Sequence, residues 1–160
     1  MLLQDIYLEI KFLKPNVSHI SLMQELVKEE VDNGNILLRT EDEMANTIRS
    51  YTIVEVDGVM AGFTALHIHS ARLAEVRSLV VSKKFRGLKL GLKLVQACID
   101  EGREYKLKQI LSLTYAKSFF ESAGFRVIEK EEIPEHKIWA DCIRCKHFPI
   151  CDEIAMVHDL

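Results

Sequence analysis

A glycine turn that joins an apolar strand to an amphipathic helix is the feature that most constrains this sequence. The strand pattern includes Val76 and the run from Leu79 to Val81, and it leads into the turn from Arg86 to Gly91 (RGLKLG). A helix that begins at such a turn leaves its first backbone N–H groups without intrahelical partners, and its dipole adds positive potential at the same end. The segment therefore predicts an anion-binding turn.

Positive charge is concentrated around this turn. Five basic residues and no acidic residue occur between positions 83 and 93: Lys83, Lys84, Arg86, Lys89 and Lys93. The whole chain has 21 Lys and Arg against 24 Asp and Glu, for a net charge of −3. A basic cluster confined to one turn of an acidic chain suits a phosphate-bearing small ligand and argues against a nucleic-acid partner.

Length and composition predict one globular domain over residues 1–160. The chain is 48% hydrophobic and has only three prolines, and it contains no linker rich in proline, glycine or serine. The N-terminal segment lacks the basic region of a secretion signal. The apolar run over 59–71 is too short to span a membrane and contains His67 and His69. We therefore expect a cytosolic protein without a membrane partner.

Three of the four cysteines lie in the last twenty residues. Cys142, Cys145 and Cys151, together with His147, supply four potential zinc ligands within ten residues. The alternative is a set of reduced thiols, which we favour because the span is cramped for a zinc site and a cytosolic protein keeps its thiols reduced. Cys98 is expected on the apolar side of the long helix. No metal is expected to take part in catalysis.

Hydrophobic periodicity predicts a mixed α/β (α+β) fold with the order β-α-α-β-β-β-α-β-α-β-β. The expected elements are a strand over 7–12, a helix from Asn16 to Asn33, a short helix from 41 to about 49, strands over 51–56, 59–68 and about 72–81, a long helix from the glycine turn to about Gly102, a strand over 109–113, a short helix over 117–123, and strands over 125–129 and 154–157.

Local signals refine these elements. Thr40 and Glu43 have the spacing of a capping box, and Asp57-Gly58 is a hairpin turn, which predicts an antiparallel meander. The long helix is expected to bury an apolar stripe that consists of Leu88, Leu92, Val95 and Ile99.

The glycine turn and a later segment resemble the GNAT acetyltransferase superfamily. Its Gln/Arg-x-x-Gly-x-Gly/Ala signature is matched at Arg86 and Gly91, and its aromatic-x-x-x-Gly-Phe segment is matched from Phe120 to Phe125. Lys89 departs from the usual glycine. The resemblance implies a central mixed sheet flanked by helices and acetyl-CoA as co-substrate. It assigns to acetyl-CoA the residues Leu79, Val80, Val81, Arg86, Gly87, Leu88, Lys89, Leu90, Gly91 and Leu92.

Further segments are similar to the short, single-domain N-acetylglutamate synthases of bacterial arginine biosynthesis. They are residues 74–79 (AEVRSL), 113–115 (LTY), 119–121 (FFE), 136–145 (HKIWADCIRC) and 151–153 (CDE). The resemblance implies an amino-acid N-acetyltransferase that acts on L-glutamate. It implies a small-molecule amino-acid partner, and a homodimer would be in keeping with the families it resembles.

Glu75 is the candidate general base. It lies eleven residues before Arg86, where several family members carry a base carboxylate that often acts through water. Strand alternation predicts that Glu75 and Arg77 share one face with Leu79 and Val81. The competing interpretation makes Glu75 only a salt-bridge partner of Arg77 or Arg72.

The general acid is less obvious. Many relatives carry a tyrosine at the position of Phe120, which cannot donate a proton. Tyr115 is the candidate acid, and its alternative role is ring packing. Because a thiol with a reference pKa of about 8.5 leaves readily, activity does not require a strong acid.

Glutamate would bring two carboxylates, so its site should contain arginine or lysine. Arg77 is the first candidate, followed by Lys117 and Lys137, and each could instead be a surface cation. His67 and His69 have no carboxylate nearby in sequence and are expected at the surface or an edge.

Two other functions fit the same features. An acetyltransferase that acts on a protein N-terminus or a lysine would need an open cleft for a peptide. A domain that senses acyl-CoA would bind acetyl-CoA without turning over any amine.

Overall fold

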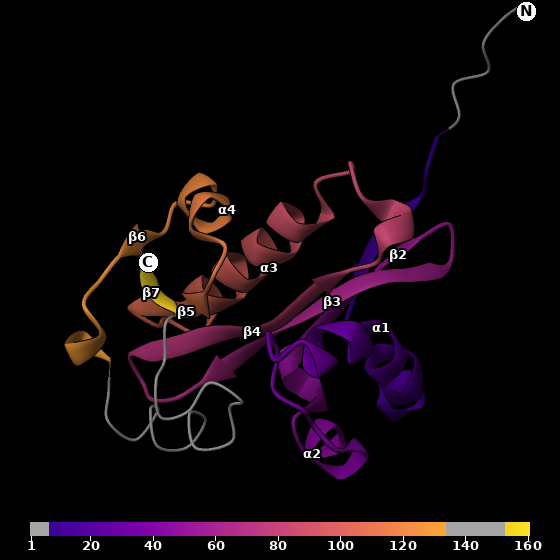
Figure 1. The fold of residues 1–160 in the computed structure, drawn as a ribbon, viewed down its shortest axis with the longest axis horizontal. Coiled ribbons are helices and arrows are strands. Elements are labelled where there is room, and N and C mark those ends of the chain that lie inside the picture. Colours follow the sequence, from indigo (N-terminus) through magenta and orange to yellow (C-terminus); the bar gives the residue numbers. More distant parts are fainter. Residues whose placement is uncertain (1–6, 134–152) are drawn as a thin grey trace, which may run out of the picture.

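The computed structural model describes residues 7–133 and 153–160, in which seven strands form one sheet in the order β1-β2-β3-β4-β5-β7-β6 (Figure 1). Strands β4 and β5 run parallel, and all other neighbours are antiparallel. The elements are β1 (Ile10–Leu13), α1 (Ile20–Asp32), α2 (Glu41–Asn46), β2 (Tyr51–Val56), β3 (Val59–Ile68), β4 (Leu73–Val81), α3 (Leu90–Glu104), β5 (Gln109–Thr114), α4 (Lys117–Ser122), β6 (Arg126–Val127) and β7 (Ile154–Asp159).

The predicted order of strands and helices is confirmed. Short 3₁₀ turns are added at Val17–His19, Ile48–Ser50, Lys83–Phe85 and Lys130–Glu132. The predicted bounds were too wide at two strands, since β1 begins at Ile10 and β6 has two residues. In the parts of the chain that the structure describes, no helix has the length and apolarity needed to cross a membrane.

The two faces of the sheet are covered by different helices, and Figure 1 shows α3 and α4 on one side and α1 and α2 on the other. On the first side, Val95 and Ile99 of α3 pack with strand residues such as Val76. On the second side, Ile20 and Met23 of α1 pack against strands β2 to β4. The sheet therefore lies between two apolar layers.

Helix α2 starts as the sequence predicts. The Thr40 hydroxyl accepts a hydrogen bond from the backbone N–H of Glu43 at 3.1 Å, which satisfies one N–H at the helix end. The helix stops at Asn46 rather than near Arg49, and a 3₁₀ turn completes the segment.

The buried stripe of α3 differs from the prediction. Val95 and Ile99 are buried, as expected, and Cys98 lies on the same apolar side. The rest of the stripe consists of Leu90 and Leu94, while Leu92 is half-buried and Leu88 precedes the helix. Because α3 begins at Leu90, residues spaced by four from it face the sheet, and Leu92 is turned well away from that direction.

Strand β4 contains a bulge that changes which side chains share a face. Phe63 of β3 pairs with Val80 and Ala65 pairs with Arg77, so that one β3 residue lies opposite both Ser78 and Leu79. Ser78 has φ 55°, which only a few per cent of non-glycine residues adopt. A Cβ at Gly62 would lie 2.6 Å from the Val80 carbonyl oxygen, so glycine permits this close approach.

The bulge corrects the predicted face assignment. Leu79 and Val81 pack on the α3 side, whereas Arg77 lies across from Ala65 on the α1 and α2 side. Glu75, two residues earlier in the regular part of the strand, shares that side with Arg77. One extra residue reverses the alternation, so the prediction of a common face was wrong.

Candidate functional site

Strands β4 and β5 separate along their length and leave a cleft between them. They pair only from Leu73 to Glu75 on β4 and from Gln109 to Leu111 on β5. The cleft has a volume of about 330 Å³ and is lined by Asn35, Ile36, Val76, Ser78, Leu79, Ser112, Leu113, Thr114, Tyr115, Ala116, Phe119, Phe120 and Glu153. Where two neighbouring strands stop pairing, their backbone groups become available to an extended ligand rich in amides.

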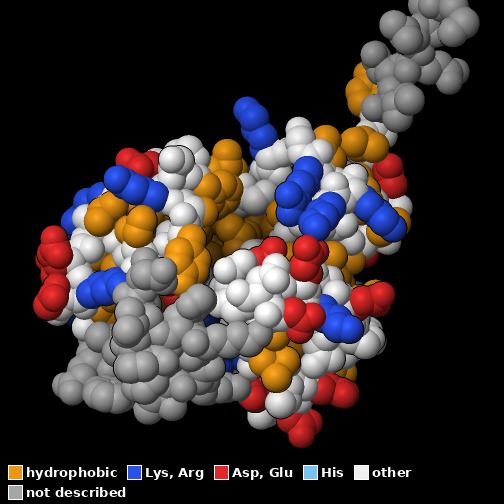
Figure 2. Space-filling model, in the orientation of Figure 1, with side chains coloured by type: hydrophobic (Ala, Val, Ile, Leu, Met, Phe, Trp, Pro, Cys, Tyr) orange, Lys and Arg blue, Asp and Glu red, His pale blue; other side chains and the backbone are white. Residues whose placement is uncertain are grey.

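The surface of the molecule also has a hollow with an apolar lining. Figure 2 shows a hollow lined by hydrophobic side chains in the middle of one face of the molecule, with Lys and Arg side chains along its upper right rim. The turn that leads into α3 supplies exposed cations, because Lys83, Lys84, Arg86 and Lys89 are all exposed. A ligand with an apolar arm and an anionic end matches this arrangement.

The backbone of the turn explains the position at which the sequence departs from the family pattern. Lys89 adopts φ 58° and ψ 30°, and Gly87 has φ 92°. The left-handed conformation costs a residue with a Cβ about 1–2 kcal/mol, and glycine avoids that cost. The glycine of the pattern therefore serves this conformation, which Lys89 adopts with strain.

Gly91 has a different role. A Cβ at this position would lie 3.3 Å from two ring atoms of Phe119, so the missing side chain lets the start of α3 pack closely against α4. The first N–H groups of α3 have no partners within the helix, and they lie at the same end as the exposed cations.

A buried ionic cluster lies on the face of β4 that is turned away from α3. Glu75 is 4% exposed, and its Oε1 accepts a hydrogen bond from Nε of Arg77 at 2.9 Å and lies 3.0 Å from Nε2 of His69. The His67 and His69 rings meet edge to face with their centroids 4.6 Å apart. The salt bridge between Glu75 and Arg77, one of the two interpretations left open by the sequence, is present.

The expectation that the two histidines lie at the surface or an edge was wrong for His69, whereas His67 is half-buried and has a carboxylate opposite it. The side chain of His69 is only 5% exposed. The register of the β3–β4 hairpin places His67 opposite Glu75, so a carboxylate six to eight residues away along the chain is adjacent in space. The hairpin pairing was the signal that could have revealed this contact.

Next to this cluster lies a cationic cavity of about 260 Å³. It is lined by Arg39, Glu43, Asn46, Thr47, Ser50, Tyr51, Ala65, His67, Arg77 and Ser78. Arg39 was not among the predicted site residues, because an arginine before a short helix carries no functional signal in sequence. Its Nη1 lies 3.8 Å from Oε2 of Glu43. Burial raises the pKa of Tyr51, although Arg39 and Arg77 oppose the shift, so its phenol stays protonated.

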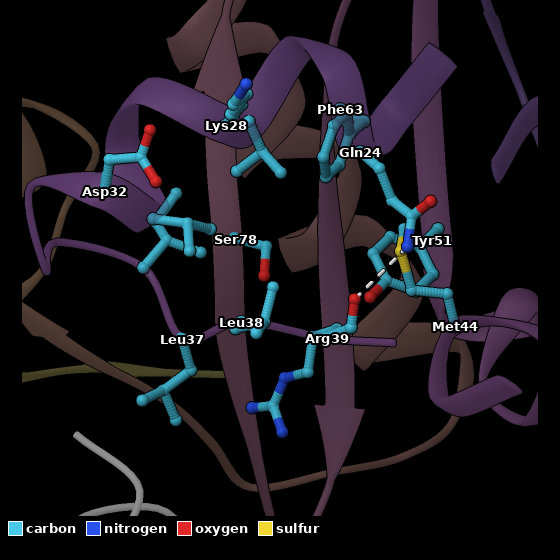
Figure 3. A pocket seen from close by; sticks show the side chains of 13 residues that line it. Gln24, Lys28, Asp32, Leu37, Leu38, Arg39, Met44, Tyr51, Phe63 and Ser78 are labelled. Atoms are coloured by element: carbon cyan, nitrogen blue, oxygen red, sulfur yellow. Dashed lines mark hydrogen bonds between the residues drawn. The ribbon is translucent and has the colours of Figure 1, made fainter. Parts of the chain in front are cut away.

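A third cavity, of about 300 Å³, lies between α1 and β4 (Figure 3). Its lining is mostly apolar and consists of Gln24, Val27, Lys28, Val31, Asp32, Ile36, Leu37, Leu38, Arg39, Met44, Tyr51, Phe63 and Ser78. Ser78 lines all three cavities. The bulge is therefore the point at which the cleft, the cationic cavity and the apolar cavity meet.

The aromatic candidates in the cleft differ in exposure. Tyr115 lines the cleft and is 43% exposed, so its hydroxyl is within reach of solvent. Phe120 is 5% exposed and packs edge to face against Phe119 and Phe125, with centroid distances of 5.1 Å in both pairs.

The remaining predicted residues are one exposed lysine and a group outside the described residues. Lys117 is exposed at the start of α4 and does not line any of the three cavities. Lys137, Cys142, Cys145 and Cys151 lie outside the described residues. Within 7–133 and 153–160, no group of three or more His, Cys, Asp or Glu side chains could hold a metal ion.

Comparisons with known proteins agree with the fold. Residues 19–125 match the acetyltransferase (GNAT) family. An uncharacterized N-acetyltransferase from Chlorobaculum tepidum is 33% identical over 140 residues, which cover 88% of this chain and 90% of that protein. An amino-acid acetyltransferase from Pasteurella multocida is 25% identical over 123 residues, which cover 76% of this chain but only 28% of that protein.

A solved structure shows the same fold at lower identity. It is that of N-acetylglutamate synthase from Neisseria gonorrhoeae complexed with coenzyme A and N-acetyl-glutamate. The TM-score is 0.83 at 21% identity, and the match covers 98% of this chain and 36% of that chain. This chain therefore spans about a third of the larger protein.

Proposed function

Because the chain belongs to the acetyltransferase (GNAT) family, we propose that it transfers the acetyl group of acetyl-CoA to the α-amine of a free amino acid, L-glutamate. The observation that carries the proposal is the cationic cavity that meets the cleft at Ser78. Relatives whose names describe amino-acid acetyltransferases, and a structural relative that binds N-acetyl-glutamate, support the same acceptor class.

In this proposal, two arginines bind the acceptor. Arg39 and Arg77 line the cationic cavity, and glutamate carries two carboxylates that match two guanidinium groups. Glu75 fixes the orientation of Arg77 through their 2.9 Å hydrogen bond. A basic peptide would instead place its cations beside these arginines, which is electrostatically unfavourable.

The donor, acetyl-CoA, occupies the cleft and the glycine turn in this proposal. In this proposal the segment from Arg86 to Leu92 binds the pyrophosphate of acetyl-CoA, and the segment from Leu79 to Val81 contacts the pantetheine. The thioester then lies at the bulge, where the distorted strand presents backbone N–H groups to the developing oxyanion.

The chemistry is direct attack within a ternary complex. The neutral amine attacks the thioester carbon, a C–N bond forms, the C–S bond breaks, the amine loses a proton and the CoA thiolate takes one up. Glu75 stays the predicted base, acting through water, and orienting Arg77 is its competing role. Tyr115 stays the predicted acid at the leaving thiolate.

One assay tests the acceptor. The protein is incubated with acetyl-CoA and a panel of free amino acids, with a basic peptide as the competing acceptor, and products are identified by mass. We expect N-acetylglutamate to form and Arg39→Gln to raise KM for glutamate more than KM for acetyl-CoA. Acetylation of the peptide alone would refute the amino-acid acceptor, and tight binding of acetyl-CoA without any product would favour a sensor.

A pH profile tests the base. Glu75→Gln should lower turnover most at low pH, where the amine needs help to lose its proton. Glu75→Asp, which keeps the carboxylate, should retain part of the rate. If both variants change only KM for glutamate at every pH, Glu75 acts by positioning Arg77 and not as a base.

A further inference from the structure

The apolar cavity between α1 and β4 shares only Arg39, Tyr51 and Ser78 with the cationic cavity that the proposed function gives to the acceptor. Figure 3 shows Lys28 and Asp32 on α1 at one side of the cavity, Leu37 and Leu38 at another, and Ser78 in the middle. Most of its lining is aliphatic or aromatic. Such a lining favours a hydrocarbon group over a charged one.

The position of the cavity relative to the cleft indicates which molecule would reach it. The two share Ser78 and Ile36. With the thioester at the bulge, the substituent on the carbonyl carbon projects past Ser78, on the side away from the sulfur. An acetyl group has a single methyl there and would leave the rest of the cavity unfilled.

We propose that the apolar cavity binds the aliphatic chain of an acyl donor longer than acetyl, so that short-chain acyl-CoA thioesters are donor substrates. The proposal rests on the placement of CoA in the cleft under the proposed function. It changes the donor class and leaves the acceptor unchanged.

The size of the cavity suits a short chain. A cavity of about 150 Å³ lined by aliphatic and aromatic residues is large enough to hold benzene, and this cavity has about twice that volume. Val27, Met44 and Phe63 line it, and the last two are buried. Butyryl to hexanoyl chains are therefore the expected occupants.

The polar side chains of the lining are either engaged within the protein or exposed. Gln24 donates a hydrogen bond to the carbonyl oxygen of Arg39 at 3.4 Å, and the guanidinium of Arg39, which also lines the cavity, has its Nη1 3.8 Å from Oε2 of Glu43. Lys28 is exposed, and Lys28 and Asp32 both lie on α1 at one side of the cavity. A terminal carboxylate on the acyl chain would lose hydration and would have to compete with Glu43 for Arg39, so succinyl-CoA should bind less well than butyryl-CoA.

The transfer step has the same balance as acetyl transfer. The C–N bond of the amide forms, the C–S bond breaks, the amine proton leaves, and the thiolate of CoA is protonated. The product is an N-acyl amino acid with the longer chain.

The test measures donor binding by calorimetry without an acceptor, with CoA, acetyl-CoA, butyryl-CoA, hexanoyl-CoA and succinyl-CoA. We expect binding to tighten by about fourfold for each buried methylene, which corresponds to ~0.8 kcal/mol. Butyryl-CoA should thus bind on the order of tenfold more tightly than acetyl-CoA. Equal binding of the two, or tighter binding of succinyl-CoA, would overturn the proposal.

Variants that fill the cavity locate the effect. Val27→Phe should abolish the preference for butyryl-CoA while the Kd of acetyl-CoA stays within about twofold of wild type. Leu22→Phe is the matched control, because Leu22 is on the same helix, 53% exposed and outside the cavity. Val31→Phe serves as a second filling variant if Val27→Phe does not fold. A preference that survives filling would place the chain elsewhere and refute the proposal.

Failure of this proposal can be told apart from failure of the proposed function. Because no acceptor is present, an error in the identity of the amino acid does not affect the binding data. If acetyl-CoA itself does not bind, both proposals fail. If filling the cavity raises only KM for glutamate in turnover assays, the cavity holds the acceptor and the donor proposal is wrong.

Discussion

The proposed donor side and the proposed acceptor side of the candidate site are built in opposite ways. The donor turn is one continuous segment, 79–92, with exposed cations and a strained backbone. The acceptor side combines Arg39 from the segment before α2, His67 from β3, and Glu75 and Arg77 from β4, with much of its charge buried. A motif contiguous in sequence is recognisable before folding, whereas a cluster assembled from three segments is not.

The difference has energetic consequences. Exposed cations on the turn are hydrated and screened by salt, so losing one costs the folded state little. The carboxylate of Glu75 is buried and depends on Arg77 and His69 for compensation. Losing a partner there leaves an uncompensated charge, which is costly. Substitutions on the two sides should therefore differ more in their effect on the free energy of unfolding than in their effect on ligand binding.

The largest effect is expected for Arg77→Met. It should lower the free energy of unfolding by about 3–5 kcal/mol, because Glu75 would remain buried without the guanidinium that donates to it at 2.9 Å. Urea denaturation measures this change. Arg86→Met on the exposed turn is the matched comparison and should stay within about 0.5 kcal/mol of wild type. The double variant Glu75→Gln/Arg77→Met should recover most of the lost free energy of unfolding. Equal losses in Arg77→Met and Arg86→Met would contradict the difference between the buried side and the exposed side.

The bulge should give the next largest effect. Ser78→Val places a β-branched residue at φ 55° and should destabilise the fold by about 1–3 kcal/mol. Ser78→Gly should be neutral or stabilising, because glycine adopts this conformation without strain. Thermal unfolding of both variants checks the prediction. If Ser78→Val were as stable as Ser78→Gly, the backbone conformation at the bulge would not restrict which residue β4 can have there.

A smaller effect is expected for Lys89→Gly. Removing the side chain should relieve the left-handed strain and raise the free energy of unfolding by about 1 kcal/mol. The same change should weaken acetyl-CoA binding by about two- to fivefold, because one exposed cation near the phosphates is lost. Lys89→Arg, which keeps the charge and the strain, should change neither quantity much. Unchanged binding in both variants would show that Lys89 does not contact the pyrophosphate.

The smallest effect concerns Cys98, in the buried part of the helix that begins at the exposed turn. Burial raises the pKa of its thiol to about 12 from 9.0. Because the folded state disfavours the thiolate, the protonated Cys98 thiol contributes fully to the free energy of unfolding below pH 9.0. This contribution is lost as the pH rises toward about 12. At pH 8, alkylation followed by peptide mapping should leave Cys98 unmodified in the native protein and modified in urea. Rapid native alkylation would contradict its burial.

The order of strands and helices was predictable because each signal is local. Thr40 caps α2, Asp57-Gly58 closes a hairpin, and Gly124 ends α4 with φ 90°. The long helix was located correctly, although two of its four predicted stripe residues were wrong, because the left-handed residue at Lys89 sets where the helix begins.

The acceptor side was only half predictable. Glu75 and Arg77 were singled out in sequence, and the structure joins them in one salt bridge. Arg39 and the two histidines were missed or misjudged, because their significance depends on the register of the β3–β4 hairpin and on the packing of the segment before α2. Pairing of distant segments leaves no local trace in composition or spacing.

By itself the sequence determined the element order, the glycine turn with its cations, and the resemblance to one acetyltransferase family. These properties depend on local backbone preferences and short motifs, which a chain carries before it folds. Only the tertiary structure decided which faces the side chains of β4 occupy, since one bulged residue at Ser78 reverses the alternation. It also decided that three cavities meet at that residue, because their walls come from segments that become neighbours only when the sheet and both helical layers are packed.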